Sequence, residues 1–110
     1  MELPEMITRL LEADLPFPPS KLKTSVLQSA SGQMVSFQIF DDIDVPPHSH
    51  KVRWAIVLEG ELEMTVGGQT RKYGQGEACC IPAGVVHSAR VPAGCTAMDF
   101  FEEPDRCKLR

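Results

Sequence analysis

Hydrophobic and polar residues alternate over several stretches of this chain, which is the pattern of β-strands with one buried face. The alternation runs through residues 34–40, 61–66 and 95–101, and successive side chains of a strand point to opposite faces of a sheet. Gly67-Gly68 separates residues 61–66 from residues 69–73, at a place where a two-residue hairpin needs positive φ angles. The sequence therefore predicts an all-β sandwich or barrel.

The first 33 residues follow a different pattern. Apolar residues recur at helical spacing from Glu5 to Ala13 and predict a short N-terminal helix, which the proline-rich segment 15–19 ends. We expect residues 1–33 to form this helix and a proline-rich arm that packs on a barrel of residues 34–110. Such an arm often covers the mouth of a barrel or lies on a neighbouring subunit. A loop packed on its own domain is an equal alternative.

Composition limits the class of protein. The 110 residues correspond to one domain, and the formal net charge of -4 gives no basic surface for nucleic acid or anionic lipid. The first residues lack a basic start and a small-residue cleavage site, and no apolar run has the length of a membrane span. The four cysteines lack the spacing of a metal finger. We expect a cytoplasmic protein with reduced thiols and with neither a nucleic-acid nor a membrane partner.

The three histidines of the chain predict a metal site. His48 and His50 lie two residues apart, so in an extended strand both rings face the same side. His87 follows Pro82 and Gly84, which indicate a turn that fixes where the third ring enters. Neutral imidazoles suit a divalent ion (Fe, Zn, Ni, Mn or Cu) and leave positions open for water or substrate. We predict that His48, His50 and His87 bind one such ion, the alternative being a pocket without metal.

Two segments of the chain resemble the motifs of the cupin superfamily. Pro47-His48-Ser49-His50, followed by residues 57–62, resembles the first motif, and residues 76–87 resemble the second. The resemblance covers roughly residues 34–101. It implies a double-stranded β-helix, the cupin jelly-roll barrel, whose two motifs lie on facing strands and whose histidines hold a metal inside. It also implies a homodimer, because cupins are often dimers.

The chain departs from the cupin pattern at one metal ligand. Cupins usually have a glutamate between the second histidine and the glycine, and residues 51–55 contain no carboxylate. Counting back from Gly60 places Arg53 in that position, and a guanidinium cannot bind a metal. Strand parity places Arg53 on the face opposite His48 and His50, which favours an outward, solvated side chain. A β-bulge would turn it inward, where it would suit a substrate carboxylate or pair with a nearby acid.

Other side chains near the motifs have less specific interpretations. Trp54 fits the barrel wall or offers an aromatic face to a ligand, which makes it, with Arg53, a candidate substrate-binding residue. Cys79 and Cys80 are adjacent in an expected strand, so one faces the interior as a small hydrophobe or a thiolate ligand, and the other faces away. Spacing indicates no pair of nucleophile and base, so no catalytic residue is assigned.

These observations predict a small metal-binding cupin that binds or acts on a small organic acid. As an enzyme it would be a metal-dependent dioxygenase, isomerase or decarboxylase, in which the ion acts as a Lewis acid or activates oxygen. The alternative is a non-catalytic ligand-binding or sensor cupin, metal-free if the missing glutamate abolishes the site. Residues 54–58 are apolar on both faces of an expected strand, which favours a homodimer, with the N-terminal helix as the alternative cover.

Overall fold

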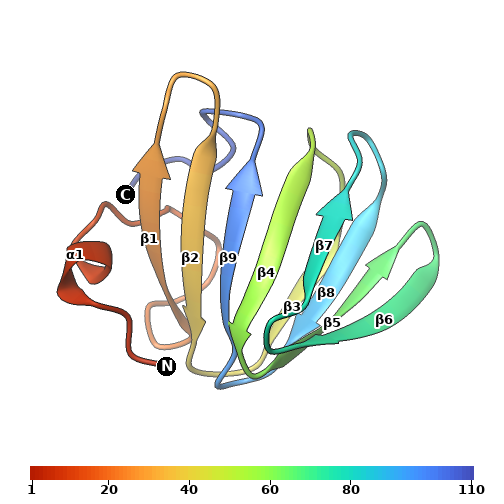
Figure 1. Cartoon of the computed structure of the whole chain (residues 1–110), viewed down its shortest axis with the longest axis horizontal. Helices are drawn as coiled ribbons and strands as arrows, with labels where there is room; N and C mark the ends of the chain where they lie inside the picture. Colours follow the sequence, from red (N-terminus) through yellow and green to blue (C-terminus); the bar gives the residue numbers. More distant parts are fainter.

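The computed structural model describes residues 1–110 and consists of two antiparallel β-sheets that face each other. Figure 1 shows the five-stranded sheet in front, in the order β1-β2-β9-β4-β7, and behind it the four-stranded sheet, in the order β3-β8-β5-β6. The strands are β1 (Leu22–Gln28), β2 (Gln33–Ile39), β3 (Ile43–His48), β4 (Arg53–Glu59), β5 (Glu61–Val66), β6 (Gln69–Gly74), β7 (Ala78–Ile81), β8 (His87–Val91) and β9 (Thr96–Phe101). The prediction of an all-β fold with one short helix is confirmed.

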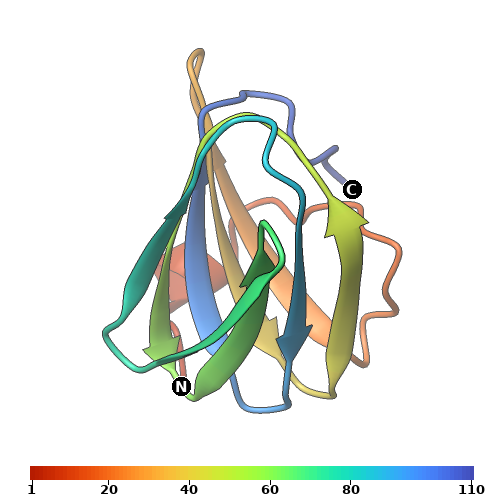
Figure 2. The same ribbon diagram turned by 90° about the vertical axis from the view of Figure 1, so that its right-hand side faces the viewer.

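The hydrophobic core lies between the two sheets, which Figure 2 shows wrapped around a common interior. Val57 of β4 and Ala97 of β9 belong to one buried cluster with Leu62 and Met64 of β5. These side chains occupy alternate positions of their strands, so the inward face of each sheet is apolar. Burying each of the larger ones contributes about 1.5–3 kcal/mol.

The predicted hairpin joins β5 to β6. Gly67 and Gly68 have φ angles of 56° and 83°, which a residue with a Cβ adopts only with strain. Thr65 and Thr70 face each other next to the turn, with their hydroxyl oxygens 2.8 Å apart. The turn chemistry therefore sets the register of this hairpin, as the sequence predicts.

The N-terminal region differs from the prediction. The helix α1 spans only Glu5–Thr8, and it buries no residue. From Leu11 the chain is extended, because the carbonyl of Leu11 accepts a hydrogen bond from the Val26 amide (2.7 Å) and the Ala13 amide donates to the Thr24 hydroxyl (2.8 Å). Bonding to the edge of β1 satisfies backbone groups that a longer helix would have used internally. Residues 22–28, expected in the arm, form strand β1 of the five-stranded sheet.

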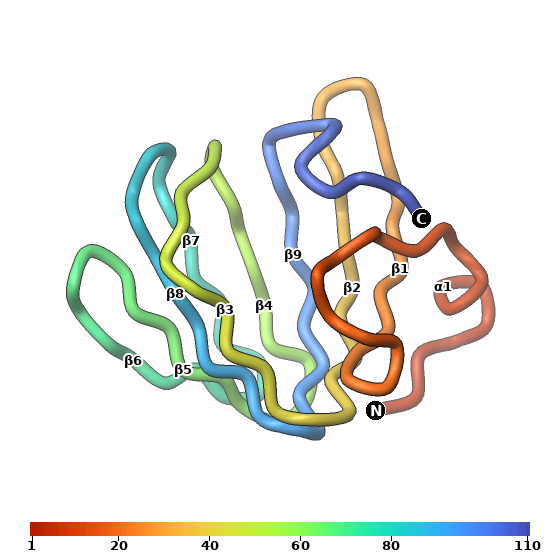
Figure 3. The backbone as a smooth tube through the Cα atoms, turned by 180° about the vertical axis from the view of Figure 1, so that it is seen from behind, coloured from red at the N-terminus to blue at the C-terminus, as the bar shows by residue number.

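The proline-rich arm lies beside the interior of the barrel. Leu15 and Phe17 line the interior cavity, and Phe17 packs against the main core cluster. Figure 3, seen from behind, shows the arm next to β3 and in front of β1 and β2. The arm therefore supplies apolar cover where the four-stranded sheet does not extend over the five-stranded one. With α1 the only helix, no helical segment has the length and hydrophobicity needed to cross a membrane.

Candidate functional site

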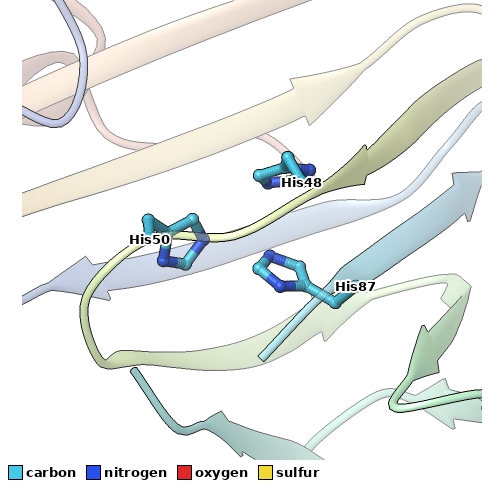
Figure 4. A group of neighbouring side chains, drawn as sticks. All are labelled: His48, His50 and His87. Carbon is cyan, nitrogen blue, oxygen red and sulfur yellow. The ribbon is translucent and has the colours of Figure 1, made fainter. Parts of the chain in front are cut away.

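The fold brings the three histidines together. His48 ends β3, His50 follows in the loop to β4, and His87 begins β8. His48 and His87 are partners in the pairing of β3 with β8, after an irregularity in the register between Val45 and His48. The ligand atoms of the three rings all lie within 4.8 Å of one another, and Figure 4 shows the rings turned toward one another. The histidines predicted as metal ligands are close enough to bind one ion.

Each histidine ring is oriented by a hydrogen bond between its Nδ1 and a backbone carbonyl oxygen. A carbonyl only accepts, so Nδ1 carries the proton of each neutral ring and Nε2 keeps its lone pair. The Nε2 atoms of His50 and His87 are buried and have no hydrogen-bond partner. Three converging lone pairs with their rings fixed from behind are what a metal ion requires. The Nδ1 to carbonyl distances are 2.8 Å for His48 and Pro46, 2.6 Å for His50 and Lys51, and 3.0 Å for His87 and Val85.

The environment of two of the rings, those of His50 and His87, favours their neutral form. Burial lowers the pKa of His87 to about 4, and the positive charge of Arg53 adds to this effect, against the hydrogen bond to the Val85 carbonyl. Burial also lowers the pKa of His50, and the charges of Arg106 and Arg53 act in the same direction. Because a histidine binds a metal only when it is unprotonated, these shifts keep His50 and His87 available as ligands at neutral pH.

A cavity of about 160 Å³ opens next to the histidines inside the barrel. Most of its lining side chains are hydrophobic, and they come from both sheets and from the arm. Such a mostly apolar cavity with a few polar groups is typical of a site for a small molecule. Its polar and charged lining residues are His48, Arg53, Tyr73, Glu77, Cys79, His87, Asp99 and Arg106.

Arg53 points into this cavity and forms a buried ion pair. Its Nη1 lies 3.4 Å from Oδ2 of Asp99, and the two side chains are 11% and 10% exposed. Its Nη2 lies 3.3 Å from the sulfur of Met64, a weak acceptor, and its Nε has no partner. Burial raises the pKa of Asp99, whereas the charge of Arg53 lowers it. The guanidinium therefore has one N–H donor without an acceptor and another with only a weak acceptor.

The family model for the cupin domain (Cupin_2) matches residues 41–100. The chain belongs to the cupin family. The matched segment contains the three histidines, strands β3 to β8 and all of β9 except Phe101. Strands β1 and β2 precede it, since β2 ends at Ile39. No curated protein matches the sequence.

Solved structures show the same cupin fold. An RmlC-like cupin from Shewanella frigidimarina is 24% identical, with a TM-score of 0.73 over 87% of this chain and 86% of that one. KdgF from Halomonas sp. is 19% identical, with a TM-score of 0.69 over 83% of this chain and 86% of that one. An oxalate decarboxylase variant from Bacillus subtilis is 16% identical, with a TM-score of 0.73 over 89% of this chain but only 29% of that one. At these identities the likeness establishes the fold alone.

The position of Arg53 corrects the expectation that it faces outward. Arg53, Ala55 and Val57 are the buried residues of β4, so they point inward. The parity argument fails because residues 49–52 lie outside the strands, and alternation does not continue through them. The barrel of this cupin therefore holds a cation where the family pattern usually places a glutamate.

Trp54 lies on the opposite face of β4, outside the barrel. Its side chain is 41% exposed and does not line the cavity. Its ring centroid lies 5.8 Å from that of Phe100 on the neighbouring strand β9. Trp54 is thus part of the barrel wall but lies on its outer face and not in the core, for the same reason of parity. Because the indole lies on the outer face of β4, it does not contact a ligand held in the cavity.

The cysteines follow the predicted alternation. Cys79 lines the cavity, Cys80 is exposed, and all four cysteines of the chain are free thiols. Burial raises the pKa of the Cys79 thiol, and its sulfur lies 3.9 Å from that of Met64. A protonated thiol is a poor metal ligand, so Cys79 acts as a small apolar side chain of the cavity wall.

Sequence reasoning missed three charged residues of the cavity, Glu77, Asp99 and Arg106. Asp99 lies between Ala97 and Phe101 on the inward face of β9. A carboxylate at an inward position of an alternating strand is the signal that would have identified it, because buried charges need a partner. Arg106 lies beyond the last strand, and no periodic pattern there indicates its position.

Proposed function

We propose that this cupin binds a divalent metal ion through His48, His50 and His87 and binds a small organic acid in the adjacent cavity. The observation that supports this most is the convergence of three Nε2 lone pairs, two of them buried without a partner. Bound there, the ion would supply Lewis-acid or oxygen-activating chemistry, as a dioxygenase, isomerase or decarboxylase requires. The candidate ions remain Fe, Zn, Ni, Mn and Cu. Oxalate decarboxylase, which shares the fold, acts on an organic acid and has Mn(II) centres.

The proposed role of Arg53 is to bind the acid. Its planar fork matches a carboxylate, and its unpartnered Nε is a buried donor that a ligand oxygen would satisfy. Asp99 balances the arginine charge, so the pair is stable before the ligand arrives. The apolar walls exclude water from the bound acid and strengthen these polar contacts.

The second candidate function is a non-catalytic ligand-binding or sensor cupin. The inward Arg53 favours it, because a cation near three histidines weakens the binding of a divalent ion. In that case the cavity would hold the acid without metal. None of the residues assigned to the site serves as a general base, which also fits a binding protein.

Elemental analysis of untagged protein purified without chelator distinguishes the two functions. Near-stoichiometric metal in the native protein, lost in His87→Ala, supports the metal site, and the identity of the metal selects the reaction to assay. Arg90→Ala is a matched control, because Arg90 lies on the surface of the same strand β8. Absence of metal after anaerobic reconstitution would refute the metal site and leave the binding function.

We further propose that the protein is a homodimer in the cytoplasm. The outer face of the five-stranded sheet carries an apolar row in which each residue is paired with the next across neighbouring strands: Leu27, Met34, Phe100, Trp54 and Cys80. Leu27, Phe100 and Trp54 are 55%, 45% and 41% exposed. A second copy of the chain would cover this row. The four free thiols support a reducing compartment.

A further inference from the structure

The charged residues that line the cavity leave one positive charge without a counter-ion. Arg53 is paired with Asp99 at 3.4 Å, and Glu77 is paired with Arg71 at 3.1 Å. The structure contains no ion pair for Arg106, the remaining charged residue of the cavity wall. The four charged side chains of the wall sum to zero, but Glu77 is paired with Arg71, which does not line the cavity, so the positive charge of Arg106 is left without a partner there.

Arg106 lies at the cavity, with its guanidinium against the ring of Phe101. Its guanidinium carbon lies 5.7 Å from the centroid of Phe101, whose ring also meets His50 edge-on at 5.5 Å. Its Nε is buried and has no hydrogen-bond partner. A partly buried guanidinium with an unused donor and no counter-ion favours the binding of an anion.

The backbone next to Arg106 is fixed from inside the sheet. Gln33 of β2 is 2% exposed. Its Oε1 accepts a hydrogen bond of 2.9 Å from the Cys107 backbone amide, and its Nε2 donates one of 2.9 Å to the Cys107 carbonyl. Two backbone hydrogen bonds then join the C-terminal segment to the N-terminal one. The Asp14 amide donates to the Lys108 carbonyl, and the Arg110 amide donates to the Glu12 carbonyl. The C-terminal segment is thus part of the cavity wall, and the arginine does not depend on a free chain end for its position.

The remaining cavity selects the body of the ligand. Its volume is about 160 Å³ and its lining is mostly hydrophobic, and an apolar cavity of about 150 Å³ in another protein holds benzene. A second ionised group on the ligand would lose its hydration against apolar walls. The space therefore suits a compact apolar body with a single anionic group.

We infer that Arg106 anchors the anionic group of a small monocarboxylate whose apolar body, about the size of a benzene ring, fills the barrel cavity. This inference rests on the proposed organic-acid function and adds to it the class of acid and a second arginine outside the segment that defines the family. Arg53, already paired with Asp99, then contributes hydrogen bonds, and Arg106 contributes the positive charge that no ion pair uses.

Calorimetric titration with benzoate tests the inference on the whole chain, first stripped of metal with a chelator. We expect benzoate to bind, Arg106→Gln to weaken binding at least tenfold, and Arg106→Lys to lie between the two. Arg90→Gln is the control, since Arg90 pairs with Asp44 on the exterior and both side chains are more than three-quarters exposed, at 77% and 82%. Benzamide, a neutral analogue, and oxalate, a dianion with no apolar body, should bind at least tenfold more weakly than benzoate.

Three results would overturn the inference: no benzoate binding, equal affinity of the wild type and a folded Arg106→Gln, or equal affinity of benzoate and benzamide. Circular dichroism of each variant shows whether it is folded, and Arg106→Lys serves if the glutamine variant is not. The outcome is separable from that of the metal experiment. If elemental analysis finds no metal but benzoate binding depends on Arg106, the inference is supported and the metal site is refuted. If metal is stoichiometric but benzoate binding does not depend on Arg106, the metal site is supported and the inference is refuted.

Discussion

The side chain of Gln33 binds the backbone of Cys107 through two hydrogen bonds of 2.9 Å, although 74 residues separate them in the chain. Both groups are buried. The contact joins strand β2 to the C-terminal segment that carries Arg106, and it uses both the donor and the acceptor of one amide. It is the main polar link between the five-stranded sheet and the end of the chain.

Removing this link should destabilise the protein. Gln33→Leu leaves the amide and carbonyl of Cys107 buried without partners, which costs about 2–4 kcal/mol at roughly 1–2 kcal/mol for each group. Urea unfolding measures the change, with Gln75→Leu as the exposed control. A loss below about 1 kcal/mol would mean that water replaces the amide and that the segment is not anchored here.

The Arg53–Asp99 pair should behave as a buried ion pair. Asp99→Ala leaves the arginine charge without compensation and should cost about 3–5 kcal/mol, whereas the double variant Arg53→Met/Asp99→Leu should recover most of that loss. The surface variant Asp44→Ala, which breaks the exposed pair with Arg90, should cost no more than about 1 kcal/mol. Urea unfolding of these proteins and of the single variants Arg53→Met and Asp99→Leu provides the test, and additive effects of the two substitutions would contradict the pairing.

The low pKa of His87 predicts a loss of stability in acid. Because burial lowers the pKa to about 4 in the folded protein, against about 6.5 in an unfolded chain, the unfolded state takes up the proton first as the pH falls. Stability is complete above pH ~6.5 and decreases toward pH ~4, by about 2–3 kcal/mol. Unfolding of metal-free wild type and His87→Gln across this range measures the effect as their difference. Parallel curves for the two proteins would rule out His87 as the cause.

The apolar row on the outer face predicts concentration-dependent association. Trp54→Glu places a charge in the middle of the row and should shift the protein toward a 12.1 kDa monomer in sedimentation. Gln69→Glu, on an exposed position of β6 in the other sheet, is the control and should leave the association unchanged. A wild type that sediments only as the 12.1 kDa species would refute the homodimer.

Some features of the site were accessible from local sequence alone. The spacing of His48 and His50 and the turn before His87 predicted a cluster that the structure brings within 4.8 Å. The glycine pair at 67–68 predicted the hairpin, because positive φ at both positions is a local requirement. Each of these predictions depends on residues that are close in the chain or on a motif with fixed spacing.

The direction of Arg53 was not accessible in the same way. Alternation predicts faces within a strand, but the loop between His48 and Arg53 has no fixed period, so the parity of one strand does not determine that of the next. The early end of the N-terminal helix has a similar cause. Its apolar residues keep a helical spacing, yet hydrogen bonds to the edge of β1 favour an extended chain from Leu11 onward.

The sequence by itself determined the fold class, the cupin family resemblance and the identity of the three converging histidines, because those depend on period, turn chemistry and motif spacing. Only the tertiary structure decided what charge surrounds them. Asp99 reaches Arg53 because β9 lies beside β4, and Arg106 reaches the cavity because Gln33 holds the segment after β9. Contacts of this kind arise from the order of strands in a sheet, which no local pattern of residues specifies.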